Sequence, residues 1–268
     1  MKRNVILIAI ASMLTLSLSA QQARHDIRQH VELAGSNYVA YPGPKKALTA
    51  APKGYEAYYI SHYGRHGSRY LIGTNDYDKP YNMLLKADSL GKLTAKGKDV
   101  LAKVKLIREE AQLRDGELTL LGAQQHRGIA KRMYERFPEV FKGKTAIDAR
   151  STIVIRCILS MENELQQLAS MNPQLEIAHD ASVHDMWYLN DSHSPYNRLR
   201  DTKEASKANS EFSKRHDNWG HLMTVLFSDP EYVKTINAGS LAHHLFKLTS
   251  NVQSTELRHQ LSLCDIFT

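Results

Sequence analysis

The sequence predicts an α/β fold in which helices flank a central, mostly parallel sheet. Short strand patterns at residues 55–64, 145–152 and 174–180 alternate with long amphipathic helical patterns, which is typical of such a sheet. The 268 residues, 42% hydrophobic and 24% charged, suit one large domain or one domain with an insertion. We expect residues 21–180 to form the α/β core and residues 181–268 to form a mainly helical insertion or subdomain.

The elements follow in order along the chain. Residues 24–55 contain Pro and Gly without a clean period, so we expect an irregular lead-in before the first strand. Helical patterns then cover residues 79–91, 94–116 and 119–141. In the third pattern Thr119 is the predicted N-cap and Pro138 ends the helix. A fourth helix is expected over residues 153–171, with Ser151 or Thr152 as its cap.

The first twenty residues have the features of a secretory signal peptide. A basic start precedes an apolar run, and small residues precede a polar stretch, so cleavage is expected after Ala20. A membrane anchor is the alternative, but the apolar run is short for a span. We therefore expect export to the periplasm or outside the cell, with no stable membrane anchor after cleavage.

The charge balance points to a small anionic partner. Loss of Lys2 and Arg3 with the signal lowers the Lys and Arg count from 35 to 33, against 28 acidic residues, so the mature net charge is +5. No basic helix with interleaved aromatic residues and no zinc-knuckle spacing is present, so nucleic acid is not the expected partner. An exported protein permits a disulfide, and the sequence leaves open whether Cys157 and Cys264 pair.

The stretch SHYGRHGSRYL, residues 61–71, gathers positive charge around one histidine. Arg65, His66 and Arg69 lie where the first predicted strand ends, and Arg156 lies in the second turn of the helix that follows the second strand. In open α/β sheets the ligand site lies beyond the carboxyl ends of the strands. Guanidinium groups and a helix N-terminus bind phosphate. Neighbouring cations keep a histidine neutral, and neutral imidazole is a nucleophile. The alternative is a solvated basic loop with a packed histidine.

Four segments, in the same order, resemble those of the histidine acid phosphatases, the branch-two histidine phosphatases. RHGSR is similar to the RHGxRxP signature, and GELTLLGAQQHRGIAKRMYERF, ARSTIVIRCILS and LCDIFT resemble later family segments. The resemblance covers about residues 55–268 and is greatest to bacterial multiple inositol polyphosphate phosphatases, or phytases. It implies a histidine-phosphatase-like sheet, His66 as the nucleophile that becomes phosphohistidine, and a phosphate clamp of Arg65, Arg69 and Arg156. We interpret Arg150 as a supporting residue at a strand end.

The sequence departs from the family pattern in two places. Tyr70 follows Arg69 where the family has proline. The family also has a late histidine followed by Asp, or by Ala-Glu, which supplies the proton donor. The His-Asp pairs of this chain, beginning at His25, His179, His184 and His216, all precede the expected position, so none is assigned as donor. We expect the donor to lie beyond residue 268 and the chain to be truncated at its C-terminal end.

The predicted function is hydrolysis of inositol polyphosphates such as phytate, without a metal or other cofactor. A broad-specificity acid phosphatase of the same family is one alternative. A phosphate-binding pseudoenzyme or inactive fragment is another, because the donor is missing. A metal-dependent phosphoesterase that uses His62, His66, His179 and His184 is a third. The order of phosphate removal, the pH optimum and the oligomeric state do not follow from the sequence.

Overall fold

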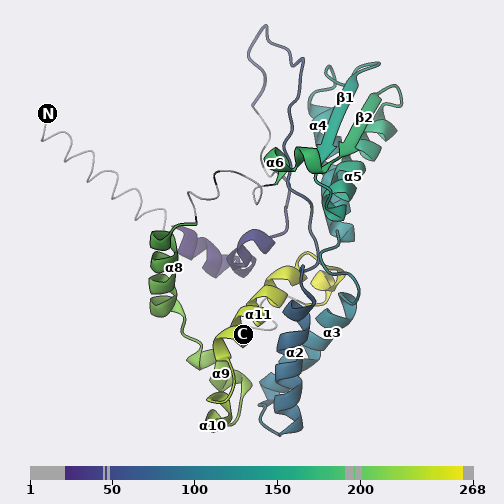
Figure 1. Ribbon diagram of the computed structural model, residues 1–268. Coiled ribbons are helices and arrows are strands. Elements are labelled where there is room, and N and C mark those ends of the chain that lie inside the picture. The colour runs from purple at the N-terminus through teal and green to yellow at the C-terminus, as the bar shows by residue number, and fades with distance from the viewer. Residues whose placement is uncertain (1–21, 45, 47–48, 191–195, 197–200, 262–268) are drawn as a thin grey trace, which may run out of the picture.

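A computed structural model gives the structure of the chain and describes residues 22–44, 46, 49–190, 196 and 201–261. The predicted signal peptide and Cys264 lie outside these residues. Figure 1 shows two groups of elements. One contains β1, β2, α4 and α5, and the other contains α2, α3, α9, α10 and α11. The chain segment before α2 passes between the two groups.

The α/β group is a parallel strand pair with helices packed on it. Strands β1 (Ala146–Ser151) and β2 (Glu176–Ala181) pair in parallel over their full length, with Ala146 opposite Glu176. Helix α5 (Ile155–Met171) connects them, as parallel strands require a crossover. Helix α4 (Leu120–Arg136) packs along α5. The structure is therefore mixed α/β, and the expected central sheet is shown only as these two strands among the described residues.

The first predicted strand is not formed. Residues 55–64 belong to no strand or helix, and Tyr58 is 93% exposed. A strand exists only through hydrogen bonds to a neighbour, and within the described part of the chain β1 pairs with β2 alone. The Tyr-rich composition of residues 55–64 favours an extended strand. Within the described residues no neighbouring strand pairs with this stretch, so the strand does not form.

The helices of the first half follow the amphipathic patterns. Helix α2 (Thr74–Ser89) begins earlier than predicted, and α3 (Ala95–Glu110) begins after Thr94, whose hydroxyl accepts from the Gly97 amide. Thr119 caps α4 as predicted, accepting from Gly122 N at 3.1 Å, and the helix ends two residues before Pro138. The predicted cap of α5 is wrong. Its N-cap is Val154, which has no side-chain cap bond, because the helix starts later than Ser151 and Thr152.

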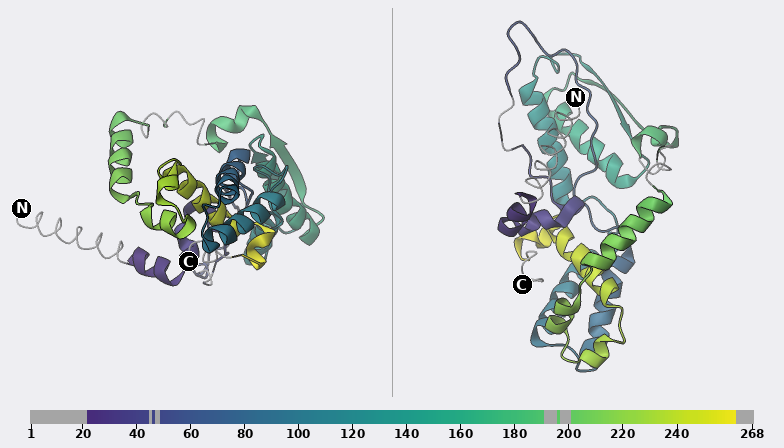
Figure 2. Two further views of the ribbon diagram at one scale, coloured as in Figure 1. Left: turned by 90° about the horizontal axis from the view of Figure 1, so that it is seen from below. Right: turned by 90° about the vertical axis from the view of Figure 1, so that its left-hand side faces the viewer.

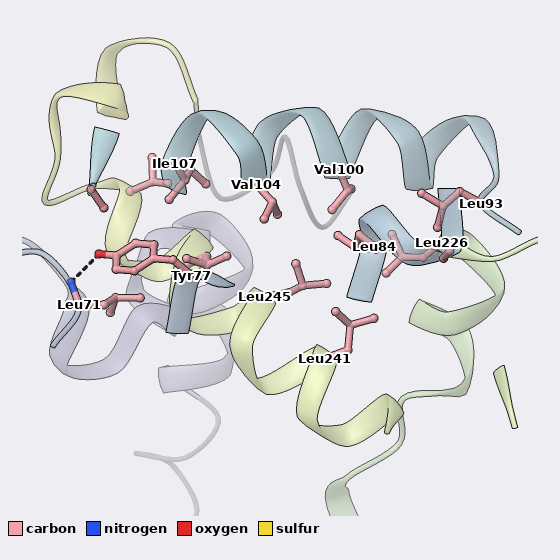
Figure 3. Close-up of a cluster of buried hydrophobic side chains, with 14 of the residues drawn as sticks. Leu71, Tyr77, Leu84, Leu93, Val100, Val104, Ile107, Leu226, Leu241 and Leu245 are labelled. Carbon is pink, nitrogen blue, oxygen red and sulfur yellow. Dashed lines mark hydrogen bonds between the residues drawn. The ribbon is translucent and has the colours of Figure 1, made fainter. Parts of the chain in front are cut away.

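The largest apolar core lies among helices rather than on the sheet (Figure 3). Helix α11 (Ala238–Val252) packs on α2, and α9 (Gly220–Leu226) packs on α3. Leu84, Val100, Val104, Leu241 and Leu245 are almost completely buried between them. A smaller cluster in the α/β group is built on Ala130, Phe141 and Leu168. The helical content after residue 181 agrees with the sequence pattern, and the boundary at residue 180 stays a prediction.

The remaining elements are short or lie at the surface. Residues 22–29 are helical and a 3-10 helix, η1 (Val31–Tyr38), follows, so the lead-in is more regular than predicted. Helix α8 (Lys203–His216) buries no residue and lies to one side of both groups (Figures 1 and 2). The short elements are η2 (Val183–Asp185), α6 (Met186–Leu189), α10 (Pro230–Val233) and η4 (Glu256–His259). Within the described ranges, no helix combines the length and the apolar character needed to cross a bilayer.

Candidate active site

The loop from Gly64 to Arg69 is fixed by hydrogen bonds to α4 and α5. The Ser68 carbonyl accepts from both the amide and the hydroxyl of Thr119, at 2.9 and 3.0 Å, and the Ser68 amide donates to Gln125 Oε1 at 2.9 Å. The Gly67 amide donates to Ser160 Oγ at 3.1 Å. These bonds tie the loop to the start of α4 and to the middle of α5. The positions of its side chains are therefore set by two helices rather than by the loop itself.

Two glycines let the loop lie directly against α4. A Cβ on Gly67 would be 2.5 Å from the carbonyl oxygen of Gly122, and a Cβ on Gly122 would be 2.3 Å from the carbonyl oxygen of Ser68. Real side chains do not make such contacts with backbone. The glycine beside the histidine is therefore needed for the close approach of a helix.

The hydrogen bonding of His66 makes its Nε2 a free base. Nδ1 lies 2.8 Å from the Gly67 carbonyl oxygen, and because a carbonyl can only accept, Nδ1 carries the proton. The pKa of His66 is lowered to about 4, chiefly by burial and also by the charges of Arg156, Arg65 and Arg69, against the opposing effect of the Gly67 bond. At neutral pH the imidazole is uncharged, with the lone pair of Nε2 available for attack.

Three arginines surround this imidazole without a carboxylate partner in the described structure. Each guanidinium donates to a backbone carbonyl: Arg65 to Asn37 at 3.3 Å, Arg69 to Tyr70 at 2.7 Å and Arg156 to Gly116 at 3.4 Å. The Nε atoms of Arg69 and Arg156 are buried and have no hydrogen-bond acceptor among the described residues. Burial, and next the charge of Arg156, lowers the pKa of Arg69. Neighbouring like charges, two of them half-buried with unused Nε donors, form a site that an anion would stabilise.

The site opens into two cavities that share His66 and Arg65. The smaller, of about 530 Å³, is lined by Arg69 and by the chain from Asn37 to Pro42. The larger, of about 1150 Å³, is lined by Arg156, by β1 and by the first turn of α5. The predicted strand-end position of the site holds for Arg156, whose helix follows β1. It does not hold for His66, because no strand precedes its loop.

Several contributing residues were not found from the sequence. Asn251 of α11 donates to the Arg69 carbonyl oxygen at 2.9 Å and lines the smaller cavity with Ser254. Ser160 and Gln125 hold the loop, and each stands on a helix where a polar side chain is ordinary. The segment ARSTIVIRCILS, which ends at Ser160, and the segment GELTLLGAQQHRGIAKRMYERF, which contains Gln125, gave a signal for these two residues, and no sequence pattern indicated Asn251 or Ser254.

Of the other sequence candidates, His179 and His184 line neither cavity, whereas Arg150 lines the larger cavity and His62 lines both. Arg150 forms an ion pair with Asp148 of its own strand at 3.0 Å, and one with Asp180 of β2 at 3.4 Å that joins the two strands near their ends. His179 pairs with Glu162, and His184 pairs with Asp185. In the described residues no group of three His, Cys, Asp or Glu side chains is arranged to hold a metal ion. Cys157 is half-buried. Its possible disulfide partner, Cys264, lies outside the described residues.

Comparison with known proteins relates the chain to one group of solved structures. No family model and no curated protein sequence matches it. It does resemble crystal structures of the Bifidobacterium longum multiple inositol polyphosphate phosphatase. The complex with inositol hexasulfate is 17% identical, with a TM-score of 0.58, covering 85% of this chain and 64% of that one. The apo form is 18% identical, with a TM-score of 0.59 and coverages of 86% and 64%.

A third crystal structure, the complex with phosphate, is 17% identical with a TM-score of 0.58 and coverages of 85% and 63%. The chain has a related fold. It spans less than two thirds of the length of each of these structures. At this identity the likeness concerns the fold, and what the site does is argued from its own residues.

Proposed function

We propose that this protein is an exported phosphomonoesterase that hydrolyses inositol polyphosphates through a phosphohistidine at His66. The observation that carries the proposal is an unprotonated Nε2 surrounded by three arginines that no carboxylate neutralises in the described structure. A phosphate ester supplies the negative charge that this site lacks. The solved structures of related fold hold phosphate in one case and inositol hexasulfate in another, which supports an anionic ester as ligand.

The proposed reaction has two steps at one phosphorus atom. The Nε2 lone pair of His66 attacks phosphorus, the bond from phosphorus to the ester oxygen breaks, and the oxygen leaves with its electron pair and takes up a proton. Water then attacks the phosphohistidine, returning the electron pair to Nε2 and releasing phosphate. Arg65, Arg69 and Arg156 hold the phosphoryl oxygens, whose charge redistributes during transfer. The first step also needs a general acid that gives its proton to the leaving oxygen.

The cavities favour a substrate larger than a simple phosphate ester. A volume of about 1150 Å³ beside the smaller cavity leaves space around the attacked phosphate for a ring that carries further phosphates. A broad-specificity acid phosphatase and an inactive phosphate-binding protein are the alternatives. A broad-specificity phosphatase would release phosphate from p-nitrophenyl phosphate as readily as from inositol hexakisphosphate. An inactive phosphate-binding protein would bind inositol hexakisphosphate without releasing phosphate from it.

The decisive experiment traps the intermediate. Protein mixed briefly with ³²P-labelled substrate and then denatured in alkali is expected to retain label on His66, and acid is expected to release it. The His66→Ala variant is expected to lose labelling and turnover while its melting temperature and phosphate binding stay close to those of the unaltered protein. His184→Ala is a matched control, since His184 is an exposed histidine paired with Asp185 outside the arginine centre. Turnover in His66→Ala within tenfold of the unaltered protein would remove the nucleophile assignment, and loss of activity with EDTA would favour the metal-dependent alternative.

A further inference from the structure

Next to the arginine centre, one carboxylate joins two histidines. Glu164 of α5 lies between them, with Oε1 2.6 Å from His126 Nδ1 and Oε2 3.3 Å from His62 Nδ1. A carboxylate accepts, so both Nδ1 atoms carry protons that point at it. The side chains of His126 and Glu164 are 5% and 14% exposed, whereas that of His62 is 36% exposed. His62 is therefore the member of this group that solvent or a ligand can reach.

The free edge of the His62 ring faces the catalytic loop. Its Nε2 lies 3.4 Å, and its Cε1 3.2 Å, from where a Cβ on Gly64 would stand, and Gly64 directly precedes Arg65. His62 lines both cavities, together with Arg65 and His66. Since Nδ1 is used by Glu164, the nitrogen that remains for a ligand is Nε2.

The environment of His62 favours its charged form. The hydrogen bond that His62 donates to Glu164 raises the pKa of His62 more than burial lowers it. Burial alone would raise the pKa of Glu164, but its bonds to His126 and His62 hold that pKa below the ordinary value. Glu164 thus stays ionised, and the imidazolium of His62 presents Nε2–H as a donor in mildly acidic solution. The opposite holds for His66, whose pKa is lowered.

We propose that His62 is a substrate-binding residue that donates through Nε2 to a phosphate of the substrate, and that Glu164 is the positioning residue that aims it and keeps it protonated. The inference rests on the proposed function in one respect, because it takes the ligand to be a polyanionic phosphate ester. The charged and titratable groups that face His62 are Glu164 of α5, His126 of α4, and Arg65 and His66 of its own loop. Only Glu164 among them is an anion, so the effect of pH on His62 is controlled by that contact.

Binding of myo-inositol hexasulfate tests the proposal without turnover. Sulfate groups keep their charge across mildly acidic and mildly basic pH, so any change in affinity reports the protein and not the ligand. Isothermal titration calorimetry on the unaltered protein is expected to give an affinity that falls as pH rises past the pKa of His62. The size expected is about tenfold, as for one charge-assisted hydrogen bond that is partly exposed.

Three variants distinguish direct binding by His62 from positioning by Glu164. In His62→Asn the side-chain amide keeps a donor to Glu164 and removes Nε2 with its charge. Its affinity is expected to be about tenfold lower at acidic pH and equal to that of the unaltered protein at basic pH. Glu164→Gln is expected to shift the midpoint of the pH dependence to lower pH. His179→Asn is the matched control, because His179 bonds Glu162 of the same helix at 2.6 Å but lines neither cavity, and it is expected to change nothing.

The outcomes are distinct for this inference and for the proposed function. Equal affinities of His62→Asn and the unaltered protein at acidic pH would overturn the role of His62 while the phosphatase proposal stands. Binding with the expected pH dependence but no phosphate release from inositol hexakisphosphate would uphold His62 and overturn the enzyme. No binding of hexasulfate or phosphate by the unaltered protein would overturn both. Should Glu164→Gln fail to fold, the His62→Asn titration alone decides.

Discussion

Gly67→Ala is expected to damage the site without altering any charged group. The new Cβ would lie 2.5 Å from the carbonyl oxygen of Gly122, and 2.7 and 2.8 Å from its Cα and carbonyl carbon. Real Cβ contacts essentially never fall below 3.0 Å, so the loop must move away from α4 by about half an ångström or more. All three obstructing atoms are backbone and cannot rotate aside. Overpacking of this kind costs about 1–3 kcal/mol of unfolding free energy.

The displacement should weaken catalysis more than it weakens the fold. The loop carries Arg65, His66 and Arg69, and misplacing reacting groups by about 1 Å can cost on the order of 10²-fold in rate. For a chain of this size each kcal/mol lowers the melting temperature by about 2–4 °C. Calorimetry and kcat/KM for inositol hexakisphosphate measure the two effects.

Gly128, a glycine of α4 at which a Cβ would not contact the loop, provides the control for Gly67→Ala. At Gly128→Ala the Cβ would meet only the flexible end of Arg132 at 3.1 Å, so this variant should be neutral or more stable by up to about 1 kcal/mol. Gly67→Ala with unchanged stability and activity would show that the loop does not depend on this close contact.

Three further predictions concern charge and capping. Because the pKa of His66 is about 4, Nε2 is unprotonated above that pH, and kcat/KM is expected to fall about tenfold per pH unit below it. A pH–rate profile that instead falls near pH 6.5 would place the nucleophile in an ordinary environment. Thr119→Ala removes the hydroxyl's bonds to Gly122 N and the Ser68 carbonyl and is expected to lower the free energy of unfolding by about 1–2 kcal/mol, measured with urea. Thr119→Ser keeps the hydroxyl and should retain most of this stability. Arg156→Met removes a like charge beside Arg69 and is expected to raise the melting temperature while weakening phosphate binding at least tenfold in calorimetry. A variant that loses stability together with binding would show that Arg156 serves the fold.

The parts of the fold that were predictable depend on neighbours in the sequence. Amphipathic periods located α3 and α4, and Thr119 marked the start of α4, since a cap is completed within three residues. The strand expected at residues 55–64 was wrong because a strand depends on a partner elsewhere in the chain. Likewise, the packing of α11 against α2 joins segments about 160 residues apart, and no local pattern indicates it.

The same distinction explains which part of the site the sequence revealed. Arg65, His66 and Arg69 fall within five residues, so their unfavourable concentration of charge is visible in the sequence alone. The groups that make this concentration tolerable or useful come from other elements, such as Ser160 and Asn251. A serine or asparagine on a helix has no distinguishing neighbour, so its role appears only when the helices are packed.

Glu164 shows why a resemblance cannot supply the rest. In the sequence it is one of two glutamates in MENELQQ, and nothing separates it from Glu162. In the structure the two lie two residues apart on α5, and each bonds a histidine at 2.6 Å. Glu162 holds the half-exposed His179 outside both cavities, whereas Glu164 is largely buried and holds, besides His126, also His62, which faces the arginine centre. Chemically similar pairs thus differ in what they can do because helix positions two residues apart point about 200° apart, one toward the loop and one away from it. The difference lies in the direction of the side chain, which is set by how α5 packs on α4.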